Sequence, residues 1–237
     1  MITKNVMEKA KMLWSEFLEP ISKISENDNT HVALVDHQFI MYNFDKITKN
    51  LYNNKACPTS ADALFINDKE IEFIEFKSGF KQKITKNKLR DTKAKCDEYF
   101  KMTGHLHVCK TFWEFFFKNQ NRERKILIES IRLKSIESYM SLEKKVLNTC
   151  DDLNNQKKIK VKFTIVIDED GIDNYEKVLG EISNKPAPKE NCFTLIEESL
   201  KRIKNQKDSS GQDYLYDEIS VLSTKDFIAR LNSINAS

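Results

Sequence analysis

The sequence predicts an α/β fold in which a small mixed β-sheet is flanked by helices. Three observations support it: two short apolar strand segments joined by a turn, a later apolar strand segment, and amphipathic helical segments on either side of them. The chain has 237 residues, of which 40% are hydrophobic, and a net charge of only +3. Such a chain can bury a core and is not disordered, so we expect a single domain over residues 1–237.

The N-terminal quarter is predicted to be mainly helical. Apolar residues recur at helical spacing over residues 4–25, and Pro20 is expected to kink or end that helix. Residues 31–41 are apolar but fit neither period clearly. Residues 43–52 look like a short helix, and residues 53–60 have the composition of a loop.

The middle of the chain begins with a predicted β-hairpin. Residues 61–66 and 71–77 read as strands around a tight turn at 67–70. A basic helix is expected from Thr85 to Met102, with Thr85 as its N-cap. Residues 105–152 are expected to form a helical insertion that contains a long amphipathic stretch.

The remainder is predicted to alternate strands and helices. The alternating and then apolar run at 160–167 is typical of a central strand, and residues 214–222 read as a last strand. The expected helices lie at 173–182, at 193–203, and from a cap at Ser223 or Thr224 through Leu231.

Composition excludes several classes of protein. No apolar run approaches the roughly 20 residues that span a bilayer, and the first residues lack the apolar core of a secretory signal. The five cysteines form no Cys-x-x-Cys pair, which argues against a disulfide framework and a thiolate zinc site. We therefore expect free thiols in a cytoplasmic protein without a membrane partner.

The positive charge is concentrated in one segment. Residues 77–125 contain 14 basic and 5 acidic side chains, a net charge of +9. A phosphate backbone is attracted to such a segment, and Lys88, Arg90 and Lys95 on the basic helix are the expected nucleic-acid contacts. A lysine-rich helix face that only contacts solvent is the alternative, and charge alone does not separate the two.

The predicted hairpin carries the chemistry. Either a two-residue or a four-residue turn at 67–70 brings Asp62 directly opposite Glu75, with their Cβ atoms about 4.5–5.5 Å apart on one face. Two carboxylates this close repel each other unless a cation lies between them. Carboxylates, water and substrate phosphate are what Mg²⁺ prefers, and Lys77 nearby can stabilise phosphorane charge or position the attacking water.

Ser60-Ala61-Asp62, followed after twelve residues by Glu75-Phe76-Lys77, resembles the signature of the PD-(D/E)xK nuclease superfamily. The resemblance implies a restriction-endonuclease-like αβββαβ core and a divalent-metal-dependent phosphodiesterase. It makes Asp62 and Glu75 the metal-binding acids, Lys77 the catalytic lysine and the Phe76 carbonyl a further metal ligand.

The match has departures. Ala61 stands where the family has proline, and no Gln-x-x-x-Tyr motif follows in the next helix. The family's leading-helix acid has no fixed spacing, so Glu8, Glu16 and Glu19 are all open, with Glu16 preferred as a metal ligand. The alternative interpretation, in which the hairpin has no functional site, is an edge hairpin whose charged side chains face solvent.

The functional expectation is a Mg²⁺-dependent endonuclease, with Mn²⁺ as a substitute, that acts on DNA in preference to RNA. By analogy it belongs to antiviral defence or a mobile element and works as a homodimer or with a partner protein. One alternative is a catalytically silent binding or assembly module with the nuclease fold. Another is a toxin that cuts RNA or hydrolyses nucleotides with the same metal chemistry.

Other motifs are assigned to structure. The acidic run at 168–171 reads as a turn at a strand end, since no bidentate glutamate follows at the calcium-loop spacing. The aromatic run at 112–117 reads as core packing in preference to base stacking. The four histidines are too scattered for a zinc site.

Overall fold

The computed structural model describes part of the chain, including six strands. The described residues are 4–28, 30–78, 98, 101, 126–143, 159–168, 196, 197, 199, 200, 203 and 215–235. Several predictions therefore lie outside them: the body of the basic helix with Lys88, Arg90 and Lys95, the ends of the 105–152 insertion, and the 173–182 helix.

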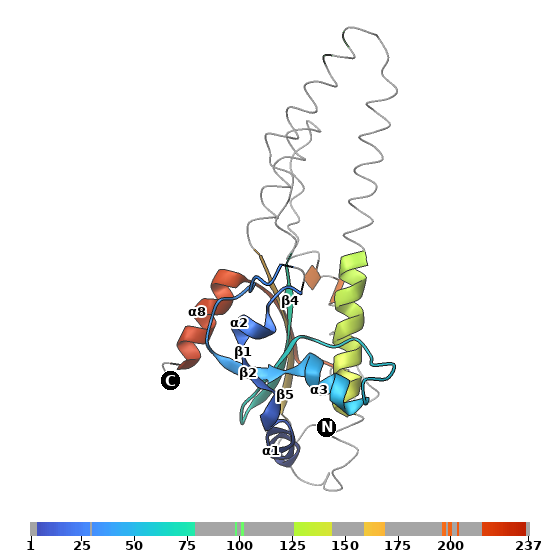
Figure 1. Cartoon of the computed structure of the whole chain (residues 1–237), viewed down its shortest axis with the longest axis vertical. Coiled ribbons are helices and arrows are strands. Elements are labelled where there is room, and N and C mark those ends of the chain that lie inside the picture. Colours follow the sequence, from blue (N-terminus) through green and yellow to red (C-terminus); the bar gives the residue numbers. More distant parts are fainter. Residues whose placement is uncertain are drawn as a thin grey trace.

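Six described strands form one mixed sheet, with helices on both of its faces (Figure 1). β1 to β4 pair antiparallel in sequence order, and β5 and β6 continue parallel to β4. The α/β class is thus confirmed. The strands are β1 (Leu18–Pro20), β2 (Ile40–Asn43), β3 (Ala63–Ile66), β4 (Glu70–Lys77), β5 (Lys160–Ile167) and β6 (Glu218–Ser223).

Two hydrophobic clusters lie on the two faces of this sheet. The larger cluster joins α1 (Lys4–Leu13), α3 (Phe44–Leu51) and the helical residues 126–143 to the sheet. The smaller one joins α2 (Ile21–Ile24) and α8 (Thr224–Asn235) to the other face. In Figure 1 the yellow-green helix of residues 126–143 and the red α8 lie on opposite sides of the strands.

The single N-terminal helix expected over residues 4–25 is wrong as a continuous element. α1 ends at Leu13, a 3₁₀ turn follows at Ser15–Phe17, and Leu18–Pro20 pairs with β2 as an edge strand. Proline is tolerated there because an edge strand needs no second set of hydrogen bonds. The chain then crosses to the other face, where Ile21 is fully buried in the smaller cluster. Local apolar spacing cannot detect this crossing.

The β3–β4 hairpin has the predicted register. Its turn is closed by Asn67, whose backbone N–H donates to the Glu70 carbonyl at 3.1 Å and whose side-chain oxygen accepts from the backbone N–H of Lys69 at 2.8 Å. Asp68 and Lys69 therefore form a two-residue turn. The pairing of Leu64 with Phe73 continues along the strands toward Asp62 and Glu75.

β4 is an interior strand, because it pairs with β3 on one side and β5 on the other. Its six central residues are all buried. The alternative of an edge hairpin with solvent-facing charges is therefore wrong. On the face covered by α8, the Glu72 carboxylate is held at both oxygens by the Arg230 guanidinium and also accepts from the Thr164 hydroxyl.

Side chains cap the starts of two helices, and the cap at Ser223 is one of the two candidates predicted for the last helix. The side chain of Asn43 accepts from the Lys46 backbone N–H at 3.0 Å, at the start of α3. Ser223 does the same for Asp226 at the start of α8, also at 3.0 Å, and its hydroxyl donates to the Asp226 carboxylate.

In the part of the chain described, none of the helices has the length and apolar character needed to cross a bilayer.

Candidate functional site

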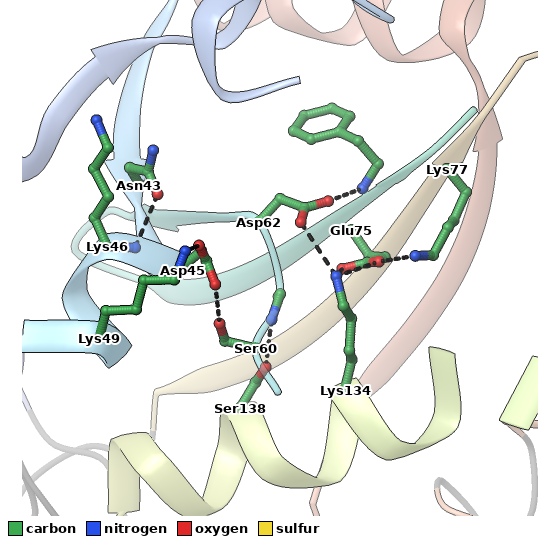
Figure 2. A network of polar contacts seen from close by, with 12 residues as sticks. Asn43, Asp45, Lys46, Lys49, Ser60, Asp62, Glu75, Lys77, Lys134 and Ser138 are labelled. Carbon is green, nitrogen blue, oxygen red and sulfur yellow. Dashed lines mark hydrogen bonds and ion pairs between the residues drawn. The ribbon is translucent and has the colours of Figure 1, made fainter. Parts of the chain in front are cut away.

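Asp62 and Glu75 form the centre of the candidate site (Figure 2). Asp62 lies directly before β3, and its Oδ2 accepts a 2.7 Å hydrogen bond from the backbone N–H of Phe76. This bond fixes the orientation of the carboxylate across the hairpin. The Glu75 side chain is fully buried, whereas the side chain of Asp62 is 24% exposed.

Two lysines neutralise this pair of carboxylates. The ammonium nitrogen of Lys77 lies 2.8 Å from Oε1 of Glu75. The ammonium nitrogen of Lys134 lies between the two acids, 2.8 Å from Oε1 of Glu75 and 3.3 Å from Oδ1 of Asp62. Figure 2 shows Lys134 rising from its helix toward both acids and Lys77 approaching Glu75 from the other side. The four side chains have no net formal charge.

Small side chains bring the Lys134 helix close to the sheet. Ser135, Ser138 and Ser141 are all buried, and their spacing places them near one helix face. Ser138 Oγ accepts from the backbone N–H of Ala61 at 2.7 Å, directly before Asp62. The same helix holds the neighbouring Thr59 N–H through the Glu137 carboxylate at 2.6 Å. The segment that carries Asp62 is thus attached to the helix that carries Lys134.

Burial and mutual repulsion set the electrostatics of the acids. Burial, together with the nearby Asp62 carboxylate, raises the pKa of Glu75 from 4.5 to about 7, although both lysines oppose the shift. Burial also raises the pKa of Asp62 against the effect of Lys134. Burial alone would lower the pKa of Lys134, but the Glu75 and Asp62 carboxylates outweigh it, and the pKa is raised. Lys134 is therefore charged, and Glu75 titrates near neutrality.

A cavity of about 310 Å³ lies beside Asp62, and Glu75 is not among the residues that line it. Asp62 lines it together with Phe76, Lys77 and Ser78 from the end of β4. The opposite wall comes from the end of α2 and the residues after it, Ile24, Ser25, Glu26, Asn27, Asp28 and Leu34. Asp62 therefore borders a hollow large enough for a phosphate group.

The leading-helix acid is not brought to this pair. Glu16 is exposed on the 3₁₀ turn, Glu8 pairs with Lys11, and Glu19 accepts from Lys46. Within the described residues, no group of three histidine, cysteine, aspartate or glutamate side chains gathers in a way that could hold a metal ion. Besides Asp62, the acids on the wall of the cavity are Glu26 and Asp28, which the sequence did not single out.

Sequence reasoning also missed Lys134. A signal was present, because Lys134 lies three residues after the buried Ile131 and four before the buried Ser138. This is the inward stripe of an amphipathic helix. A lysine on that stripe is unusual unless a buried acid faces it, which is the arrangement here.

The carboxylate oxygens of Asp62 and Glu75 supply some of the ligands that a divalent cation needs. Asp62 and Glu75 already hold one cationic group between them, the ammonium of Lys134. Carboxylate oxygens are also the ligands that Mg²⁺ prefers. Besides the two carboxylates, the Phe76 carbonyl, water and a substrate phosphate would be the further oxygen ligands. A metal ion at this position requires the Lys134 ammonium to move.

Comparison with protein-family models, with curated proteins and with solved structures found no match to this chain. The site is therefore interpreted from its own geometry.

Proposed function

We propose that this chain is a Mg²⁺-dependent nuclease that hydrolyses phosphodiester bonds, with DNA as the favoured substrate and Mn²⁺ as a substitute metal. One observation carries the proposal: Asp62 and Glu75 face each other across an interior hairpin, with Lys77 beside Glu75 and a cavity beside Asp62. A metal ion held by facing acids can activate water for phosphodiester hydrolysis, and a nearby lysine can stabilise the charge that develops on the phosphate.

The order of elements supports the restriction-endonuclease-like core that the motif implies. A helix leads into three strands that pair antiparallel in sequence, β2, β3 and β4, with α3 inserted between β2 and β3. The next strand, β5, is parallel to β4, and the connection between them contains the helical residues 126–143. This sequence of elements is compatible with the family's αβββαβ arrangement, with β1 and β6 as additions at the two edges.

The chain's own residues then have distinct tasks. Asp62, Glu75 and the Phe76 carbonyl would hold the metal, and the Phe76 N–H keeps Asp62 in position. A bound Mg²⁺ would polarise the phosphoryl oxygen and lower the pKa of a coordinated water. Lys77, whose side chain is 20% exposed and which lines the cavity, would orient the attacking water and stabilise charge on the phosphate.

The biological setting is proposed by analogy only. We place the protein in the cytoplasm, as the dispersed cysteines suggest; Cys57, the one cysteine among the described residues, is a free thiol. A role in antiviral defence, as a homodimer or with a partner protein, fits a small nuclease of this type.

A second candidate function, a catalytically silent binding module, is favoured by a specific observation. The two acids and two lysines already form a neutral cluster, with Lys134 between the acids. Such a cluster can stabilise the fold without a metal. A cleavage assay separates the two candidates.

The assay offers plasmid DNA, single-stranded DNA and RNA with Mg²⁺, Mn²⁺ or EDTA. It compares the wild type with Glu75→Gln and Lys77→Met. Lys162→Met is the matched control, because Lys162 is as exposed as Lys77 but pairs with Glu70 and Glu218 at the far end of the sheet. We expect metal-dependent cutting that each site variant lowers by about 100-fold or more and that the control retains. Equal cutting by all variants, or none by the folded wild type on any substrate, contradicts the nuclease proposal.

A further inference from the structure

The ammonium of Lys134 occupies the position between Asp62 and Glu75 that a divalent cation would need. Its nitrogen lies 2.8 Å and 3.0 Å from the two oxygens of Glu75 and 3.3 Å from the nearer oxygen of Asp62. The three oxygens therefore converge on one cationic centre. This lysine and a metal ion cannot share that centre, so binding of one must displace the other.

The charges of the site explain why the lysine holds the centre in the free protein. Two carboxylates balance two ammonium groups, Lys77 and Lys134. Adding a divalent cation while both lysines stay leaves an excess of two positive charges in a site where Glu75 is fully buried. A phosphodiester reduces this excess, because each phosphate brings one negative charge. The metal and the nucleic acid are therefore expected to bind more strongly together than separately.

The acids are held more rigidly than the lysine. Asp62 is tied to the hairpin by the Phe76 N–H, and the residue before it is tied to Ser138. Glu75 lies in the interior strand β4. Lys134 instead reaches the acids with a flexible four-carbon stem, and its side chain is 23% exposed. The mobile member of the cluster is thus the cation.

We propose that Lys134 is an internal counter-ion that keeps the metal position closed in the free protein. When metal and nucleic acid bind together, the Lys134 ammonium leaves the carboxylates and contacts the phosphate. Lys134 is then a second lysine of the site, distinct from Lys77, and makes metal binding depend on substrate. This inference rests on the proposed nuclease function and specifies how the same site is regulated.

The test measures Mn²⁺ binding, by titration calorimetry and by the electron paramagnetic resonance signal of free Mn²⁺, at pH 8.5, where protons compete weakly for the carboxylates. Wild type is compared with Lys134→Met, which removes the charge and preserves the stem. Lys162→Met is the matched control, since Lys162 is also a half-buried lysine between two acids, Glu70 and Glu218. Each protein is titrated alone and with a phosphorothioate DNA duplex, which has the charge of the substrate but resists cleavage.

We expect Lys134→Met without DNA to bind Mn²⁺ about 10- to 100-fold more tightly than the wild type. The duplex should tighten Mn²⁺ binding to the wild type and to Lys162→Met, and much less to Lys134→Met. Lys134→Gln replaces the methionine variant if that protein does not fold, because its amide still donates to both acids without a charge.

The outcomes separate this inference from the proposed function. If wild type and Lys134→Met bind Mn²⁺ equally, or the variant binds it less tightly, the counter-ion role is wrong while the nuclease proposal stands. If no protein binds Mn²⁺, with or without the duplex, and none cleaves nucleic acid, both are wrong. Loss of Mn²⁺ binding in Glu75→Gln verifies that the titration reports this site.

Discussion

Ionisation of Glu75 should make the free protein less stable as the pH rises, and Glu75→Gln should remove this effect. The Glu75 side chain is fully buried, and burial, with the Asp62 carboxylate next to it, raises its pKa from 4.5 to about 7. Between these two values the folded protein keeps a proton that the unfolded chain has lost. Stability therefore falls as the pH rises through this window. The difference between 4.5 and about 7 corresponds to about 3 kcal/mol of unfolding free energy.

Urea unfolding at pH 5 and pH 8, with EDTA present, measures this contribution. The wild type should lose about 2–3 kcal/mol more between the two pH values than Glu75→Gln does. Glu70→Gln is the matched control, because Glu70 begins the same strand but pairs with Lys162 at 2.9 Å, away from the site. This control should keep the pH dependence of the wild type.

An equal change in unfolding free energy between pH 5 and pH 8 in the wild type and in Glu75→Gln would contradict this expectation. A gain in unfolding free energy of the wild type relative to Glu75→Gln over that range would contradict it as well. Either result means that the lysines neutralise the ionised Glu75 fully in the folded state, and that its burial has no net cost.

Three further predictions concern the frame around the site. Arg230→Met should destabilise the protein by about 3–5 kcal/mol in urea unfolding, because it leaves the fully buried Glu72 carboxylate without its cation; replacing Glu72 by glutamine as well should restore much of the loss. Ser138→Ala should lower the unfolding free energy by about 1–3 kcal/mol, because the buried Ala61 N–H loses its 2.7 Å hydrogen-bond partner. Under conditions where both variants are fully folded, Ser138→Ala should also lower the cleavage rate more than Lys162→Met does. Glu19 is partly buried, but its lysine and asparagine partners outweigh burial and lower its pKa to about 2. The unfolding free energy should therefore fall less steeply in Glu19→Gln than in the wild type as the pH is lowered below 4.5.

The hairpin was predictable because its information is local. The alternation of Ile71 to Lys77 and the turn chemistry of Asn67 fix which residues share a face and which residues pair. The register that brings Asp62 opposite Glu75 follows from those two facts alone. The cap at Ser223 was predictable for the same reason, since a cap involves only the first turn of its helix.

The rest depended on contacts between distant segments. Lys134 lies 72 residues from Asp62 and 59 from Glu75, so no local pattern states which acid faces it. Pairing of Leu18–Pro20 with β2 likewise overrides the helical spacing of the surrounding apolar residues. The acids Glu26 and Asp28 reach the cavity because the segment after α2 packs beside the end of β4. Tertiary packing, not propensity, decides each of these.

The two buried glutamates of β4 show why burial alone does not identify a functional acid. Glu72 and Glu75 lie in one strand, both fully shielded from solvent, on opposite faces. Glu72 is held by a guanidinium that contacts both of its oxygens in a planar fork and by the Thr164 hydroxyl. That geometry has no vacancy for another ligand and is costly to exchange.

Glu75 has lysines as its cations, and an ammonium is a point charge that a metal ion can replace. It also has a second acid, Asp62, within reach of the same ammonium, and that acid borders a cavity. Substitution should therefore separate the two residues. Loss of Arg230 should lower stability and leave Mn²⁺ affinity unchanged in the folded fraction, whereas loss of the Lys134 charge should change Mn²⁺ affinity with a smaller effect on folding.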